Sequence, residues 1–132
     1  IAWAEFTAAD SNEVQSVVTK AVGECDALYI PTDNTIANNT EIVKNVAVPA
    51  GIPVVTGEEG MCSGCGLATL SISYYDLGVK AAEMAYEILT NGADPAQMAI
   101  GYVTDGITEK YNADIAEALN ITIPEDMVAI EN

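Results

Sequence analysis

Short apolar runs alternate with amphipathic, helix-like stretches along most of this chain. The runs have the length and apolar character of strands, and they cover residues 1–6, 27–31, 52–57 and 67–73. Stretches in which apolar residues recur at every third or fourth position cover residues 9–23, 34–51 and 74–92. Parallel neighbouring strands need a crossover connection, usually a helix, so this alternation predicts an α/β fold: a parallel sheet with helices on both faces.

The remaining segments carry weaker patterns. GEEGMCSGCG, residues 57–66, is rich in glycine and predicts a loop between the third and fourth strands. Beyond Pro95, residues 98–104 fit a strand, 111–120 a short helix, and 121–130 a tail with some extended character. The α/β pattern is therefore strongest in the first two thirds of the chain.

The charge balance of the chain excludes several classes of partner. Four lysines, no arginine and 20 acidic residues give a net charge of -16, which repels nucleic-acid phosphates and anionic membrane surfaces. The absence of histidine excludes a Ser-His-Asp triad and any metal site that contains histidine. With 132 residues, 50% of them hydrophobic, the chain can bury a core as one domain.

The start of the chain predicts a fragment. It begins at Ile1, within a strand-like stretch, with no initiator methionine and no visible signal peptide. No window reaches the ~18 consecutive apolar residues that a membrane-spanning helix needs. We therefore expect a longer protein, whose location the missing signal does not reveal.

Polar loops follow three of the predicted strands. They are Thr32-Asp33-Asn34, Gly57-Glu58-Glu59-Gly60 and Ser73-Tyr74-Tyr75-Asp76. In open parallel sheets, ligands bind beyond the carboxyl ends of the strands. Because the fold would bring these loops to one edge, the sequence predicts a small-molecule site there.

The first of these loops has two interpretations. Asp33 or Asn34 could cap a helix that begins near Thr35, since these side chains accept hydrogen bonds from the first backbone N–H groups of a helix. The pair could equally contact a ligand, because a carboxylate and an amide hold an ammonium or a hydroxyl group. The helix N-terminus would supply N–H groups for an anion, so a zwitterionic amino acid fits. The two roles are compatible.

Glu58 and Glu59 could form a general acid/base pair, but adjacent residues of an extended stretch point to opposite sides. One of them facing a cleft as an acceptor for an ammonium group is the better interpretation. Tyr74 and Tyr75 open the long helix and point in different directions. We expect one of them to pack and the other to stack on a planar or aromatic ligand.

The cysteines do not predict a metal or redox centre. Zinc needs four ligands, and the chain has three cysteines and no histidine. Cys62 and Cys65 precede a strand, whereas a thioredoxin-like motif follows a strand and opens a helix. They could form a local disulfide in an extracellular protein, or be two small residues of a glycine-rich loop. Cys25 fits an ordinary core position.

Five blocks of the sequence together resemble one protein family. They are DALYIPTDNT, IPVVTGEEGM, LATLSISYYDLGVKAAEMAYEIL, ADPAQMAI and IAEALNITIPEDM, in this order along nearly the whole chain. The family is the extracellular solute-binding component of ABC importers, of the tryptophan/tyrosine type. The resemblance implies the C-terminal lobe of a type I periplasmic-binding-protein fold, with a flavodoxin-like sheet.

The resemblance implies a binding protein and no enzyme, cofactor or metal. Two lobes would close on a small solute, expected to be an amino acid, aromatic ones included, and deliver it to a membrane permease. The protein would work at the extracellular face of the membrane or in the periplasm, as a lipoprotein. Carried over by position, the residues expected at the cleft are Thr32, Asp33, Asn34, Glu58, Tyr74 and Tyr75.

The resemblance also implies that parts are missing. Residues 1–132 would form the C-terminal lobe without its first βα unit and without the N-terminal lobe, and residues 96–132 could cross toward that lobe. The missing strand would lie between residues 1–6 and 26–31, so we expect the fragment to self-associate through unpaired strand edges. Two other functions stay open: the small-molecule-sensing lobe of a regulator, or a small α/β hydrolase or transferase that uses Glu58 or Asp33.

Overall fold

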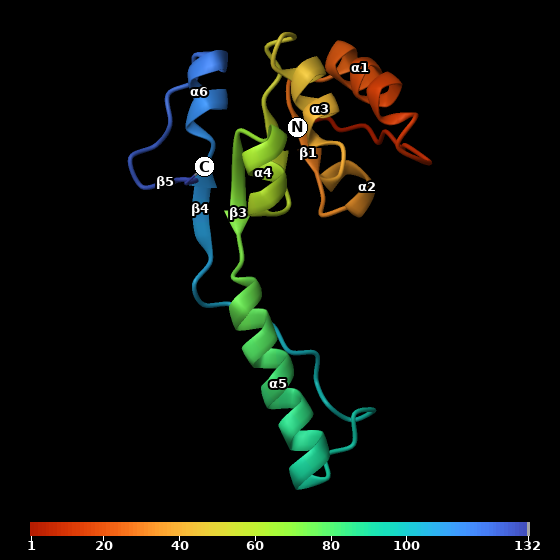
Figure 1. Cartoon of the computed structure of the whole chain (residues 1–132), viewed down its shortest axis with the longest axis vertical. Helices are drawn as coiled ribbons and strands as arrows, with labels where there is room; N and C mark the ends of the chain where they lie inside the picture. Colours follow the sequence, from red (N-terminus) through yellow and green to blue (C-terminus); the bar gives the residue numbers. More distant parts are fainter. Residues whose placement is uncertain (132) are drawn as a thin grey trace. The chain divides into compact units, whose positions relative to one another are not determined.

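The computed structural model describes residues 1–131 and divides into two units. The first unit contains residues 1–71 and 108–131, and the second contains Ile72–Ile107. The helices are α1 (Val14–Glu24), α2 (Asn34–Ala37), α3 (Thr40–Ala47), α4 (Glu59–Cys65), α5 (Tyr74–Asn91) and α6 (Ala113–Leu119). The strands are β1 (Leu28–Ile30), β2 (Val54–Thr56), β3 (Ala68–Ser71), β4 (Thr108–Tyr111) and β5 (Val128–Ala129). Figure 1 labels these elements along the chain.

The first unit contains a five-stranded sheet in the order β1-β2-β3-β4-β5. β1, β2 and β3 are parallel, β4 runs antiparallel to β3, and β5 is parallel to β4. The predicted α/β class is therefore confirmed, with a mostly parallel sheet. The strand at which the direction changes, β4, was not predicted.

One face of the sheet carries the larger core. Helices α1 and α3 pack there, and the buried cluster consists of Val14, Val18, Val43, Ala47, Val54 and Cys65. A smaller cluster, built from Leu67, Ile115 and Ala116, places α6 against Ala68 and Tyr111. By the strand register, the side chains of Tyr29, Val55 and Leu70 lie on the same face as Ala68, and they are exposed, Val55 the least of the three. The apolar stripe predicted for residues 9–23 is confirmed by the burial of Val14, Val18 and Ala21.

The glycine-rich segment 57–66 was predicted to be a loop, and this prediction is wrong because it contains helix α4. Packing explains why glycines occur in this helix. A Cβ atom on Gly64 would lie 2.4 Å from Oγ1 of Thr40, and one on Gly66 would lie 2.9 Å from Cα of Cys62. Tight contacts thus favour glycine here, and they outweigh its low helix propensity.

Two predicted strands are absent from the described residues. Residues 1–8 and 98–104 contain no strand. In the described chain, β1 is an edge strand that pairs with β2 alone, and residues 1–6 form no ladder with its open edge. A strand exists only where its backbone groups find partners. Self-association through this edge stays a prediction.

The other boundaries differ by a few residues. The helix predicted over 34–51 is two helices, α2 and α3, interrupted at Asn38 and Asn39. The helix predicted over 111–120 is α6, and the extended tail contains β5. The structure places residues 96–107 in the second unit and 108–131 in the first, and a crossing toward a further lobe stays a prediction.

The second unit consists of α5 and the segment that follows it. Gly92 ends α5 in the left-handed conformation, with φ of 70°, as the Asn-Gly pair predicts. No residue of α5 is buried, and Tyr86, Leu89 and Tyr102 are exposed in this unit. Within residues 1–131, no helix has the length and apolar character needed to cross a bilayer.

Candidate functional site

Two of the three predicted loops lie side by side at the carboxyl ends of β1 and β2. The backbone N–H of Gly57 donates a hydrogen bond to the carbonyl of Ile30 over 2.9 Å. A Cβ atom on Gly57 would lie 2.7 Å from the backbone nitrogen of Thr32, so this close approach requires glycine. Thr32 and the start of the Glu58 loop therefore form one continuous surface.

Asp33 is the N-cap of α2. Its Oδ1 accepts a hydrogen bond from the backbone N–H of Ile36 over 2.9 Å, so the capping interpretation is confirmed. Asp33 and Asn34 are exposed, and Oδ2 of Asp33 has no hydrogen-bond partner among the described residues. One oxygen of this carboxylate is therefore available to a ligand while the other holds the helix.

Glu58 is the N-cap of α4 and uses both of its carboxylate oxygens for the cap. Its Oε2 accepts from the N–H of Gly60 over 2.8 Å, and its Oε1 accepts from the N–H of Met61. Both oxygens of this carboxylate therefore bind the helix backbone. Ligand contact by Glu58, which stays a prediction, would compete with the cap.

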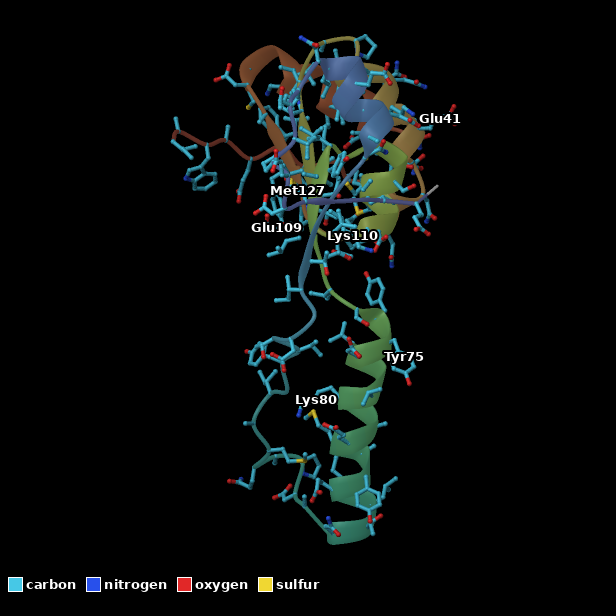
Figure 2. The ribbon with its side chains drawn as sticks, turned by 90° about the vertical axis from the view of Figure 1, so that its left-hand side faces the viewer. Glu41, Tyr75, Lys80, Glu109, Lys110 and Met127 are labelled. Atoms are coloured by element: carbon cyan, nitrogen blue, oxygen red, sulfur yellow. The ribbon has the colours of Figure 1, made fainter. Side chains whose placement is uncertain are left out.

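Glu59 is the residue that sequence reasoning undervalued. Its Oε2 lies 2.7 Å from Nζ of Lys110 and 3.2 Å from Oγ of Ser71. The register aligns Lys110 on β4 with Thr69 on β3, on the sheet face that α4 covers (Figure 2). The hydrogen bond from Lys110 lowers the pKa of the Glu59 carboxyl, although partial burial opposes this change. The pairing was missed because β4 was not predicted.

Tyr74 and Tyr75 lie in the first turn of α5, in the second unit. Ser73 caps this helix by accepting a hydrogen bond from the N–H of Asp76 over 3.2 Å. The two tyrosines are 59% and 80% exposed, so neither is buried within the second unit, and the expected packing of one of them stays a prediction. Their approach to Asp33 and Glu58 stays a prediction.

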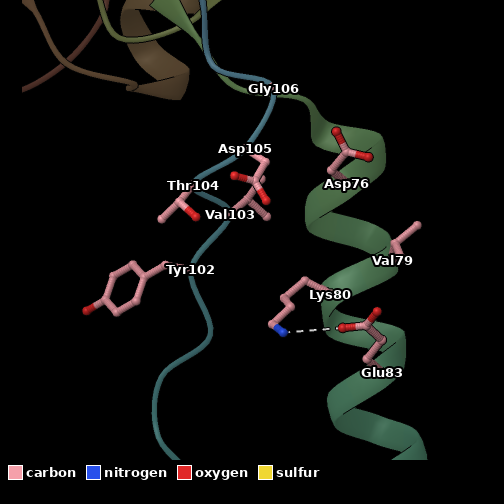
Figure 3. A pocket seen from close by; sticks show the side chains of 9 residues that line it. All are labelled: Asp76, Val79, Lys80, Glu83, Tyr102, Val103, Thr104, Asp105 and Gly106. Carbon is pink, nitrogen blue, oxygen red and sulfur yellow. Dashed lines mark hydrogen bonds and ion pairs between the residues drawn. The ribbon is translucent and has the colours of Figure 1, made fainter.

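The second unit also contains an open hollow of about 350 Å³. It lies between α5 and residues 102–106, and the ammonium of Lys80 pairs with Glu83 over 3.3 Å at its wall (Figure 3). Asp76 and Asp105 add negative charge. None of the predicted site residues lines this hollow, and its only walls are one helix and one extended segment. We assign it no role.

Cys62 and Cys65 are fully buried, free thiols on α4. Desolvation is the main cause that raises the pKa of Cys62 to about 11 and that of Cys65 to about 12. The described residues contain no group of three or more potential ligands that could hold a metal ion. These thiols pack under the sheet, and a thiol that stays protonated is a poor nucleophile and metal ligand.

These thiols are expected to be unreactive in the folded protein. At pH 8, an aromatic disulfide reagent should label Cys25 and should reach Cys62 and Cys65 only after denaturation, because both are protonated and buried. A Cys25→Ser variant is the control and should show no fast labelling.

The protein is also expected to bind no metal through these thiols. Metal analysis of protein purified without chelator should give well under one equivalent, and a stoichiometric metal that survives dialysis would contradict this expectation.

Comparisons with known proteins point to one family. The sequence model of the family described as "ABC transporter substrate binding protein" matches residues 1–131. A protein of Clostridioides difficile (strain R20291) described as "Tyrosine-binding protein" is 44% identical over 79 residues. Those residues are 60% of this chain and 23% of that protein.

Solved structures give the same result. The ABC domain from Streptococcus pneumonia in complex with L-Trp has a TM-score of 0.82 and 32% identity, covering 95% of this chain and 43% of its own. A substrate-binding protein with adhesive properties from Clostridium difficile, in its ligand-free open form, has a TM-score of 0.69 and 36% identity. It covers 92% of this chain and 41% of its own. This chain therefore spans less than half the length of these relatives.

Proposed function

The chain belongs to the ABC transporter substrate-binding protein family, and from this premise we propose that it is one lobe of a two-lobed protein that captures an amino acid. Its relatives are substrate-binding proteins rather than enzymes. The observation that carries the proposal is the similarity to a domain in complex with L-Trp, together with a relative described as tyrosine-binding. An aromatic amino acid is therefore the proposed solute.

The geometry of the first unit supports this proposal. The loops after β1 and β2 meet where Gly57 contacts Thr32, at the edge where α/β sheets bind ligands. Oδ2 of Asp33 accepts no hydrogen bond from the part of the chain that the structure describes. A carboxylate that can accept a hydrogen bond matches the ammonium group of an amino acid. The participation of Tyr74 and Tyr75 is proposed from the sequence alone, because an exposed tyrosine can stack on an aromatic solute.

The proposed partner is the membrane permease of an ABC importer, to which the loaded protein would deliver its solute. The corresponding location is the extracellular face of the membrane or the periplasm, with a lipid anchor in the full-length protein. The net charge of -16 fits a soluble, strongly hydrated protein that does not bind an anionic membrane surface directly. Family membership supports these proposals for the whole protein.

Calorimetry on the full-length gene product tests the proposed function. We expect L-tyrosine or L-tryptophan to bind at least about tenfold more tightly than 3-(4-hydroxyphenyl)propionate, because this analogue lacks the ammonium group. A tenfold ratio of affinities corresponds to ~1.4 kcal/mol. L-leucine is the control for an apolar but non-aromatic side chain. Absence of binding by every amino acid would contradict the proposal.

A further inference from the structure

Two adjacent glutamates begin α4, and the structure uses them differently. Glu58 binds the backbone N–H groups of Gly60 and Met61 through its two oxygens. Glu59 uses only Oε2, which contacts Lys110 and Ser71. Within residues 1–131, Oε1 of Glu59 has no hydrogen-bond partner. Of the two glutamates, Glu59 is therefore the one with an acceptor still available.

The neighbours of Glu59 hold it in place. Lys110 comes from β4 and Ser71 from the last position of β3, so two strands fix one carboxylate oxygen. The side chains of Lys110 and Glu59 are 26% and 39% exposed, which places the pair at the surface but not fully in water. An ion pair in this setting holds a defined orientation more firmly than a fully solvated one does.

The Glu59 carboxylate contacts Ser71, the last residue of β3, so it lies at the carboxyl end of that strand, where open α/β sheets bind ligands. Glu59 follows Gly57 by two residues, and Gly57 contacts Thr32 in the neighbouring loop. Lys110 is one of only four lysines in the chain, and it contacts Glu59 rather than standing free on the acidic surface. A carboxylate that is kept ionised and oriented, with one oxygen open, is suited to accept a hydrogen bond from an ammonium group.

We propose that Glu59 accepts a hydrogen bond from the ammonium group of the bound amino acid, and that Lys110 is the positioning residue that orients Glu59 for this contact. This inference rests on the proposed function. An ammonium group has three N–H donors, so Glu59 need not be its only acceptor. Glu59 thus becomes a ligand-binding residue in place of Glu58, whose oxygens cap the helix.

The test compares two ligands on four variants of the full-length gene product. The variants are Glu59→Gln, Lys110→Met, Lys110→Arg and, as a control, Lys80→Met. Calorimetry measures the affinity for the aromatic amino acid that binds wild type and for its analogue without the ammonium group. Lys80 also forms an ion pair with a glutamate, Glu83, but this pair is exposed and belongs to the second unit.

Glu59→Gln is expected to weaken amino acid binding by about 30-fold and to leave the affinity for the analogue unchanged, because only the ammonium contact is lost. Lys110→Met is expected to weaken amino acid binding by about tenfold, and Lys110→Arg to restore most of it, since arginine also pairs with a carboxylate. Lys80→Met should change neither affinity. Melting temperatures identify any variant that fails to fold. If the Lys110 variants fail to fold, Glu59→Gln, which keeps the size of the side chain, tests the proposed contact alone.

Three results would overturn the inference. Unchanged amino acid affinity in Glu59→Gln would remove Glu59 from the site while leaving the proposed function intact. Equal losses for the amino acid and the analogue would show that the pair only supports the fold. A wild-type protein that binds no amino acid would overturn both the inference and the proposed function.

Discussion

Replacement of Asp33 by alanine in the full-length gene product is expected to weaken amino acid binding by about 2 kcal/mol or more, roughly 30-fold, as when one partner of a buried charge pair is removed. Oδ1 of Asp33 accepts a hydrogen bond from the backbone of α2, and Oδ2 has no hydrogen-bond partner within residues 1–131. A solute that closes the site around its ammonium group would remove both charges from water. Calorimetry with the amino acid that binds wild type measures the loss.

The double role of Asp33 calls for a second variant. Asparagine is as good an N-cap as aspartate, so Asp33→Asn should keep α2 stable but lose the negative charge. Asp33→Ala should also lower the stability of the fold by about 1 kcal/mol. If both variants bind the amino acid as tightly as wild type does, Asp33 is a helix cap alone.

Asn112→Ala is expected to destabilise the fold by about 3 kcal/mol, because the side chain is buried and makes three hydrogen bonds. Its Nδ2 donates to the carbonyls of Cys62 and Ser63 over 3.2 and 2.9 Å, and its Oδ1 accepts from the N–H of Ile115 over 3.2 Å. This one residue thus joins α4 to the start of α6. Urea denaturation of the full-length gene product measures the change in unfolding free energy.

Two controls separate the parts of this effect. Asn112→Ser keeps a good N-cap but lacks the amide donors, so it should recover only about 1 kcal/mol of the loss. Asn45→Ala, on the exposed side of α3, should change the stability by less than about 0.5 kcal/mol. A loss of under about 1 kcal/mol in Asn112→Ala would show that water replaces these hydrogen bonds.

The elements that could be predicted from the sequence are those with a clear local pattern of apolar residues. The apolar runs gave β1, β2 and β3, and the periodicity of residues 74–92 gave α5 almost to the residue. The family resemblance inferred from the five sequence blocks is confirmed by the family match over residues 1–131. Short-range patterns were sufficient here because each apolar run and each helical repeat lies within a single element, although Tyr29, Val55 and Leu70 are exposed in the described chain.

The errors arose where long-range packing decides the structure. Helix α4 contains Gly60 and Gly64, and its neighbours rather than its propensities favour the helix. β4 has the sequence TEKY, whose polar residues gave no strand pattern until a partner strand was known. The Glu59–Lys110 pair joins residues 51 positions apart, and no local rule could have found it. The predicted Asp33 cap was correct because capping is itself local.

The register of β3 and β4 gives the second unit a particular topology. Ser71 and Thr108 are opposite one another on antiparallel strands, where a turn of about two to five residues ordinarily suffices. Residues 72–107 fill that place, so the second unit is an insertion into a β-hairpin. The chain leaves and re-enters the first unit through two strands that are hydrogen-bonded to each other. Ser71 and Lys110, the two partners of Glu59, therefore lie on the same two strands that connect the insertion to the first unit.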